Sequence, residues 1–429
     1  MLKIIQYIRK VIKSFKRYEL VLLLIILALS VFLRFYNLEK WFQFTWDQIH
    51  NAWVMKDMLI DGELPLVGVP IRLNSGFYMG PLYFYLLAPF YWLSGMDPLA
   101  GGYFAIIVSM FTILGLYFIT RSLFSTKAAL ISSFIYAVGY YLVYMDRIVW
   151  QVIFIPIISY AGFYLLFRIL KGNYHLFSIL GLLIGFSFHI HFTFIFLVII
   201  AVLVYVYLLV KKQKVSKSVA ISLVYFLLFF APIIIAYIYY SSAGNSINTF
   251  INTYYHGFHL VRMSQLYYDA FIQVEQVLFF RSLREIGSVL VILASFLIYF
   301  DKKINDGKII SLLILAWFII PWLVFTVYSG EISVYYFQFN RLLSVVLAGY
   351  ILGKITDISK FLYIPVILFL GFYAYSNINK FLITGYDEYP KMKKEVMETI
   401  RRQDKIEFIE NNPRSYLYYY LFNFHKDEL

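Results

Sequence analysis

The chain has 429 residues and a formal net charge of +13; 62% of the residues are hydrophobic, 21% are aromatic and only 14% are charged. A soluble globular domain is about 45–50% apolar and about 25% charged, so this composition excludes an ordinary soluble protein. The absence of cysteine excludes disulfides, thiolate catalysis and cysteine-ligated metals. Because the basic residues lie between long apolar runs, we expect membrane topology rather than nucleic-acid binding to account for the charge.

The first 17 residues form a basic segment before the first long apolar run, and six of them are Lys or Arg. The run that follows is long and lacks a small-residue cleavage site, which predicts a cytoplasmic N-terminus and a permanent anchor. Apolar runs of nearly twenty residues recur, so we predict an all-α integral membrane protein. Eleven transmembrane helices are predicted, over residues 19–36, 99–120, 128–144, 150–169, 176–190, 193–210, 218–239, 286–300, 308–328, 336–353 and 361–376.

Residues 81–95, "PLYFYLLAPFYWLSG", form a shorter apolar run that contains two prolines. Such a run is more typical of an interfacial segment than of a span, so we predict a helix in the outer interface with Pro81 at its first position. The predicted inner connections and the N-terminus then hold 19 Lys and Arg, against 9 in the outer loops. Counting the run as a span would reverse this bias, so the positive-inside rule favours the interfacial helix.

The predicted topology leaves three regions on the outer side: loop 37–98, loop 240–285 and the tail 377–429. We expect residues 1–376 to form one membrane domain. The tail is too small for a large core of its own and is expected to form a helix and a short strand. The bias toward Ile, Phe, Tyr and Lys favours a prokaryote, and hence a multi-pass plasma (inner) membrane protein with an extracytoplasmic C-terminus. The final "KDEL" matches an endoplasmic-reticulum retention signal, which we regard as the weaker interpretation.

The stretch "QFTWDQIHNAW", residues 43–53, carries an acid at the start of a predicted helix. Thr45 and Gln48 fit the capping box, in which Ser or Thr is followed three residues later by Glu or Gln. Apolar residues at helical spacing behind them predict an amphipathic helix over 46–60 that lies on the membrane. Asp47 falls in its first turn, where the helix dipole stabilises the charged form. The helix alone leaves open whether Asp47 is an ordinary first-turn acid or a functional residue.

Arginines and histidines lie at the outer ends of other predicted spans. Arg147 falls between two apolar runs, where an arginine is usually paired, snorkelling or functional, and Asp146 is one candidate partner. Arg341 opens another span from the outside. His189 and His191 lie at a third outer end. Two residues apart on a helix they point about 200° from each other, so they share a ligand only if the helix breaks between them.

His256 and His259, in outer loop 240–285, are three residues apart and so face one way on a helix. Together with Gln48 and Arg72, they are candidates for contacts with the substrates of a group-transfer reaction, either the donor or the acceptor of the transferred group. The His and acidic residues form no zinc-binding pattern, so a divalent metal is weakly supported and no cofactor is expected. One carboxylate and several cationic groups at an outer interface suit a reaction on a lipid-linked phosphate, since arginine binds phosphate oxygens and a carboxylate accepts a hydroxyl proton.

Four stretches of the sequence resemble the GT-C membrane glycosyltransferases. They are most similar to prokaryotic relatives of the dolichyl-phosphate-mannose–protein mannosyltransferases and of the lipid A aminoarabinose transferases. The stretches cover roughly residues 40–210 and read "FTWDQIHNAWVMKDMLIDGELPLVG", "GFYMGPLYFYLLAPFYWLSGMDPLAGG", "YFITRSLFSTKAALISSFIYAVGYYLVYMDRIVW" and "GLLIGFSFHIHFTF". The later spans match only in character. The resemblance implies a GT-C fold with two juxtamembrane helices in the first outer loop.

The resemblance also implies roles for single residues. The family's hallmark acid in the first outer loop maps onto Asp47, while many members carry a second acid where this chain has Gln48. Gly80-Pro81 stands in place of the family's Pro-Pro, and Arg147 matches the family's arginine after the third span. The acid commonly found a few residues later is absent here. With only one of these carboxylates present, the resemblance favours a metal-free site.

These features predict an extracytoplasmic glycosyltransferase that moves a hexosyl or pentosyl group from a polyprenyl-phosphate donor to a lipid, glycan or protein acceptor, with inversion. Asp47 would deprotonate or orient the acceptor hydroxyl. Arg147, helped by Arg341 and by His189 or His191, would hold the leaving lipid phosphate. The alternative is a transporter or flippase of lipid-linked glycans, although the sequence lacks the internal repeats and midplane charges typical of transporters.

Overall fold

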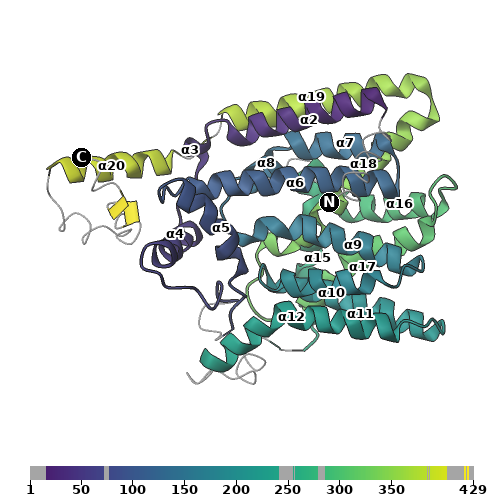
Figure 1. Ribbon diagram of the computed structural model, residues 1–429. Helices are drawn as coiled ribbons and strands as arrows, with labels where there is room; N and C mark the ends of the chain where they lie inside the picture. Colours follow the sequence, from purple (N-terminus) through teal and green to yellow (C-terminus); the bar gives the residue numbers. More distant parts are fainter. Residues whose placement is uncertain are drawn as a thin grey trace.

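A computed structural model describes the chain over most of its length (Figure 1). The described residues are 16–71, 77–240, 255, 257–278, 286–383, 385, 387–402, 420–421 and 423–424. They are almost entirely helical, and their β pairing consists of two isolated bridges. Arg72, His256 and the C-terminal "KDEL" lie outside the described residues.

A bundle of long helices forms the main body of the molecule (Figure 1). These helices are α2 (Arg17–Phe35), α6 (Ala100–Leu123), α7 (Thr126–Val138), α9 (Ile155–Leu170), α10 (Leu176–Ser187), α11 (Ile195–Val210), α12 (Ser216–Tyr240), α16 (Ile286–Phe300), α17 (Gly307–Thr326), α18 (Arg341–Ile358) and α19 (Tyr363–Ile383). Each predicted span overlaps one of them. The third span is interrupted at Gly139, whose extended backbone separates α7 from α8 (Tyr140–Met145).

Seven helices in the described part are long and apolar enough to cross a membrane. Three others, α7, α10 and α16, are apolar but contain only 12 to 15 residues. The remaining helix, α18, carries the charged residues Arg341, Lys354 and Asp357. The helices therefore agree with an integral membrane protein, while the number of eleven spans stays a prediction.

The shorter elements occupy the ends of the bundle and the connections between its helices. They are α3 (Leu38–Trp41), α4 (Trp46–Leu59), α5 (Leu82–Leu93), α14 (Leu260–Gln265), α15 (Tyr267–Leu278), α20 (Glu388–Arg402) and the 3-10 turns η1 (Gln151–Phe154), η2 (Phe192–Phe194), η4 (Val334–Asn340) and η5 (Lys360–Leu362). At a rise of 1.5 Å per residue, α5 is about 18 Å long, too short for a hydrocarbon core of about 30 Å. Its start differs slightly from the prediction, because Pro81 is the N-cap and the helix begins at Leu82.

The predicted outer helices and the predicted inner connections lie at opposite ends of the bundle. In Figure 1, α3, α4, α5 and α20 lie together at the left end, and the predicted inner connections lie at the right end. Ion pairs join those connections: Lys127 Nζ lies 2.5 Å from Asp357 Oδ1, and Lys171 Nζ lies 2.7 Å from Asp306 Oδ2. The predicted inner segments thus share one end of the molecule, opposite the predicted outer helices.

A second apolar core fills the end that carries α4 and α5. Ile49, Ala52 and Met55 follow one another at three-residue intervals along α4 and are buried in it. The C-terminal tail contributes to the same core. Tyr389 of α20 packs edge-on against Phe44 with ring centroids 5.7 Å apart. The described part of the tail is therefore packed against the first outer loop rather than around a core of its own.

Candidate active site

The predicted helix that carries Asp47 is present as α4, and it begins at Trp46 as predicted. Thr45 is the N-cap of α4, and the Gln48 side-chain oxygen accepts hydrogen bonds from the Thr45 N–H (3.2 Å) and from the Thr45 hydroxyl (2.7 Å). This confirms the capping box. Asp47 lies in the first turn of the helix, where the exposed N–H groups and the dipole favour a negative charge.

The other end of the Gln48 side chain joins α4 to the segment that follows α8. Gln48 Nε2 donates to the carbonyl oxygen of Val149 at 3.1 Å, and Asn51 Nδ2 donates to the same oxygen at 3.1 Å. Gln48 is 2% exposed, so both ends of its amide are engaged inside the protein. The amide thereby connects the helix that carries Asp47 to the chain two residues beyond Arg147.

Asp47 itself is exposed, but the protein around its carboxylate changes the titration of this group. Desolvation raises the pKa of Asp47, and the charge of His50 opposes that effect. Burial lowers the pKa of His50, and the charge of Asp47 raises it. The sequence analysis missed His50, although its position three residues after Asp47 on one helix is a signal that could have found it.

Two tyrosines also lie within electrostatic reach of Asp47. Burial, together with the charge of Asp47, raises the pKa of the α5 residue Tyr83. The same two causes raise the pKa of Tyr335, which lies in η4, far along the sequence. Tyr335 carries no local pattern that marks it, so only the fold could bring it to Asp47.

Asp146 is paired with Arg34 and not with Arg147. The Asp146 Oδ2 atom lies 2.6 Å from Arg34 Nη2 and accepts a second bond from Arg34 Nε at 3.0 Å. The Tyr136 hydroxyl donates to Oδ1 at 2.9 Å. The candidate pairing of Asp146 with its neighbour Arg147 is therefore corrected: both carboxylate oxygens are occupied by residues of α2 and α7.

Arg147 is consequently a buried cation with few partners. It is 3% exposed, and its Nη2 donates to the carbonyl oxygen of Tyr36 at 2.9 Å. Its guanidinium lies 5.5 Å from the ring centroid of Trp41 and 5.1 Å from that of Phe381. Within the described residues, Nε and Nη1 have no hydrogen-bond partner. Burial, together with the charge of Arg34, lowers the pKa of Arg147 to about 9, so it remains protonated at neutral pH.

Arg341 is a second buried arginine, and it contacts α8. It is 1% exposed, its Nε donates to Gln273 Oε1 at 3.1 Å, and its guanidinium lies 5.1 Å from the ring centroid of Tyr141. Among the described residues, no carboxylate forms an ion pair with it. Tyr141 belongs to α8, which leads directly into Asp146 and Arg147. Arg341 thus contacts α8, and Arg147 lies two residues beyond the end of the same helix.

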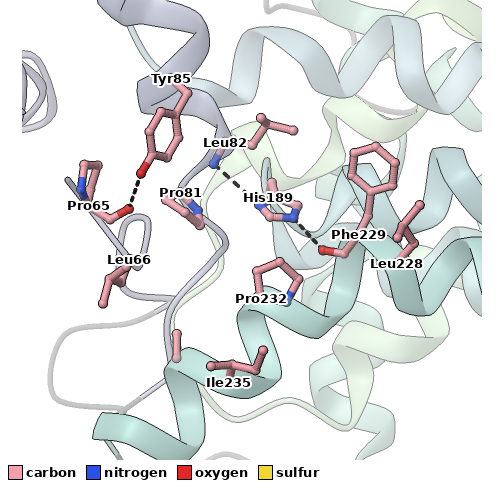
Figure 2. A pocket seen from close by; sticks show the side chains of 11 residues that line it. Pro65, Leu66, Pro81, Leu82, Tyr85, His189, Leu228, Phe229, Pro232 and Ile235 are labelled. Atoms are coloured by element: carbon pink, nitrogen blue, oxygen red, sulfur yellow. Dashed lines mark hydrogen bonds between the residues drawn. The ribbon is translucent and has the colours of Figure 1, made fainter.

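His189 forms a bridge between the start of α5 and α12 (Figure 2). Its Nδ1 accepts a hydrogen bond from the Leu82 N–H at 3.4 Å, and its Nε2 donates to the Phe229 carbonyl oxygen at 2.7 Å. Pro232 lacks an N–H and disturbs the pairing of the carbonyls one turn earlier in α12. His189, Leu82 and Phe229 line an apolar cavity of about 630 Å³ between α5 and α12. Both ring nitrogens of His189 are thus used within the protein.

His191 faces a different environment. The helix breaks after Ser187, as a shared ligand would require, but the His191 ring packs against Tyr336 (centroids 5.4 Å apart) and Tyr335 (6.0 Å). Burial lowers the pKa of His191 to about 3, so its ring is neutral at neutral pH. Tyr335 also packs against Trp150 at 4.9 Å, and this ring contact connects His191 with the segment around Arg147.

The remaining candidates lie elsewhere. His259 is exposed at the start of α14 and lines a separate cavity of about 590 Å³ with Arg262 and Tyr328. No group of three His, Cys, Asp or Glu side chains in the described ranges is placed to hold a metal ion. The described site thus centres on the accessible carboxylate of Asp47, which interacts electrostatically with His50, Tyr83 and Tyr335. Arg147 lies two residues before Val149, the residue that Gln48 of the same helix binds.

Comparison with known proteins supports the resemblance seen in the sequence. Residues 79–237 match the family described as dolichyl-phosphate-mannose-protein mannosyltransferase. This match begins at the segment leading into α5 and ends in α12, so it includes Arg147, His189 and His191. A search of curated proteins gave no match.

Solved structures extend the similarity to nearly the whole chain. The oligosaccharyltransferase of Archaeoglobus fulgidus in the apo form superposes with a TM-score of 0.57 at 15% identity, over 95% of this chain and 60% of that chain. Its complex with an inhibitory peptide and a dolichol-phosphate gives 0.55 at 14% identity, over 94% and 59%. ArnT from Cupriavidus metallidurans bound to undecaprenyl phosphate gives 0.56 at 12% identity, over 94% and 75%.

The fold is therefore that of the GT-C membrane glycosyltransferases, and the predicted resemblance is confirmed. Within this class, the chain is similar to the mannosyltransferases and to ArnT. It spans about three fifths of the length of the archaeal oligosaccharyltransferase.

Proposed function

We propose that the protein is a membrane glycosyltransferase that uses a polyprenyl-phosphate-linked sugar on the extracytoplasmic face. The observation that carries this proposal is Asp47, an accessible carboxylate with a raised pKa at the end of the bundle where Arg147 is buried without a carboxylate partner among the described residues. Related solved structures contain dolichol-phosphate or undecaprenyl phosphate. A phosphate is the kind of group that an uncompensated arginine binds.

The proposed step is a single displacement. The acceptor hydroxyl oxygen attacks the anomeric carbon, the bond from that carbon to the phosphate oxygen breaks, and the phosphate leaves with the electron pair. Asp47 receives the hydroxyl proton, and a raised pKa makes it a stronger base than an ordinary aspartate. Arg147, with Arg341, stabilises the charge that grows on the leaving phosphate. Displacement from the opposite face gives inversion.

The apolar cavity between α5 and α12 suits a chain of a lipid substrate. His189 and Tyr85 supply polar groups in its wall, and most of the lining is Leu, Pro, Phe and Ile (Figure 2). Tyr83, which lies within electrostatic reach of Asp47, directly follows the lining residue Leu82.

A transfer assay on the purified protein tests this function. Incubation with radiolabelled undecaprenyl- and dolichyl-phosphate hexoses and pentoses should release or transfer sugar. The Asp47→Asn variant should lose at least about 10²-fold in rate, because general-base catalysis contributes about that much. Glu63→Gln is the control, since it neutralises an exposed carboxylate just beyond the same helix, away from the proposed base. A flippase would leave the sugar–phosphate bond intact, and a D47N rate equal to that of E63Q would remove Asp47 from the mechanism.

The acceptor and the sugar can be sought in cells. Mass spectrometry of surface glycans and glycolipids, with and without an active gene, should reveal one sugar missing from one carrier. The loss should be reproduced by the D47N variant at normal protein level.

A further inference from the structure

Arg34 and Asp146 form a closed ion pair inside the outer half of the bundle. Arg34 binds Asp146 Oδ2 through Nε and Nη2, and its Nη1 donates to Ser30 Oγ at 2.6 Å and to the Ala137 carbonyl oxygen at 3.1 Å. Arg34 and Asp146 are 0% and 1% exposed. All the N–H donors of Arg34 are used within the protein and the pair is buried, so it does not serve as an anion-binding group.

The neighbouring arginine has the opposite character. Arg147 follows Asp146 directly in the chain, is also buried, and has no hydrogen-bond partner at Nε or Nη1 within the described residues. A buried donor without a partner is costly and calls for an unseen ligand, water or ion. The carboxylate nearest in sequence, which would satisfy Arg147, is already held by Arg34 from α2.

We infer that Arg34 is a positioning residue that holds Asp146 away from Arg147, so that Arg147 keeps one uncompensated charge and its unpartnered donors at Nε and Nη1 for an anionic phosphate. The trio carries two positive charges and one negative charge, and the Arg34–Asp146 contact assigns the surplus charge to Arg147. This inference rests on the proposed function, because it assumes that the phosphate binds at Arg147. It adds that the affinity is set by a residue that does not touch the ligand.

Undecaprenyl phosphate binding to the full-length protein in detergent tests the inference. The dissociation constant is measured by native mass spectrometry, with the melting temperature without ligand recorded separately. Arg34→Gln frees Asp146 to neutralise Arg147 and should weaken binding at least about tenfold. Asp146→Asn leaves a second uncompensated arginine and should bind as tightly as wild type or more tightly. The R34Q/D146N double variant should return to within about threefold of wild type, and Arg34→Lys should retain the affinity.

Opposite effects of the two single variants distinguish charge assignment from simple structural support. If R34Q and D146N weaken binding alike and the double variant does not recover, the pair is only structural and the inference is overturned. Should the single variants fail to fold, the double variant decides the question. A folded double variant that binds about tenfold more weakly than wild type contradicts the inference.

Arg147→Gln separates this inference from the proposed activity. A loss of affinity in R147Q supports the phosphate site. An unchanged affinity overturns the inference at its premise, whereas the proposed glycosyl transfer is judged independently by the D47N assay.

Discussion

Asp47 combines exposure with a carboxylate that is partly removed from water. Desolvation by the surrounding protein favours its neutral form and raises its pKa, and the charge of His50 opposes that effect. A base with a raised pKa accepts a proton more strongly, but it must be ionised before it can act. The acid limb of the pH profile therefore reports directly on Asp47.

We expect the transfer rate to rise with pH through the pKa of Asp47, at a higher pH than an ordinary aspartate, whose pKa is about 3.9, would give. His50⁺ lowers the pKa of Asp47, so His50→Gln should move the acid limb further up in pH. The measurement is kcat/KM against pH for wild type and H50Q. A limb that stays in place in H50Q would show that His50 does not act on the titrating group.

At the scale of elements, α5 is fastened to the rest of the molecule by close backbone contact. Gly80 donates its N–H to the Phe188 carbonyl oxygen at 3.4 Å, and Leu82 donates to His189, which in turn binds α12. A Cβ at Gly80 would lie 1.8 Å from His189 Nδ1. The resemblance to a Pro-Pro family motif gave no reason for a glycine here, and the contact with His189 supplies one.

Gly80→Ala should destabilise the protein by about 1–3 kcal/mol, because the imidazole or the α5 entry must move to admit the methyl group. Thermal unfolding in detergent measures the loss. Gly371→Ala in α19 is the matched control, since nothing lies within 4 Å of a Cβ there. The G80A/H189A double variant should recover part of the loss. If G80A unfolds at the same temperature as wild type, the contact with His189 is not tight.

At the scale of the whole molecule, the bundle has one end rich in ion pairs between basic connections and another end that holds Asp47 and the aromatic second core. This division agrees with the positive-inside pattern, since connections predicted to share a side do lie together (Figure 1). The side of the membrane that each end faces remains a prediction, and it depends on α5 not crossing the bilayer.

The absence of cysteine makes this topology easy to measure. Glu63→Cys, before α5, should react with a membrane-impermeant maleimide in intact cells. Lys303→Cys, between α16 and α17, should react only after permeabilisation. Both side chains are exposed, so a lack of labelling reports sidedness and not burial. Labelling of K303C in intact cells would show that the segment containing α5 spans the membrane after all.

Local features of the sequence were sufficient to predict the positions of most helices and two of the candidate site residues. Apolar run length located helices at every predicted span, and the Thr45–Gln48 spacing located the start of α4, because both depend on residues within a few turns of one another. The length and prolines of 81–95 likewise indicated a short helix. The motifs shared with GT-C enzymes indicated Asp47 and Arg147 as candidate site residues from the sequence alone.

The partners of these residues required three-dimensional packing. Asp146 stands beside Arg147 in the chain, yet its carboxylate is held by Arg34, 112 positions away, because α2 packs alongside α7 and α8. Tyr335 reaches the surroundings of Asp47 from the far part of the chain in the same way. Hydrogen bonds and charge effects fall off over a few ångströms, so they depend on which helix ends meet. Which helix ends meet is decided by how the apolar faces of all the helices pack against one another. A short stretch of sequence does not contain that information.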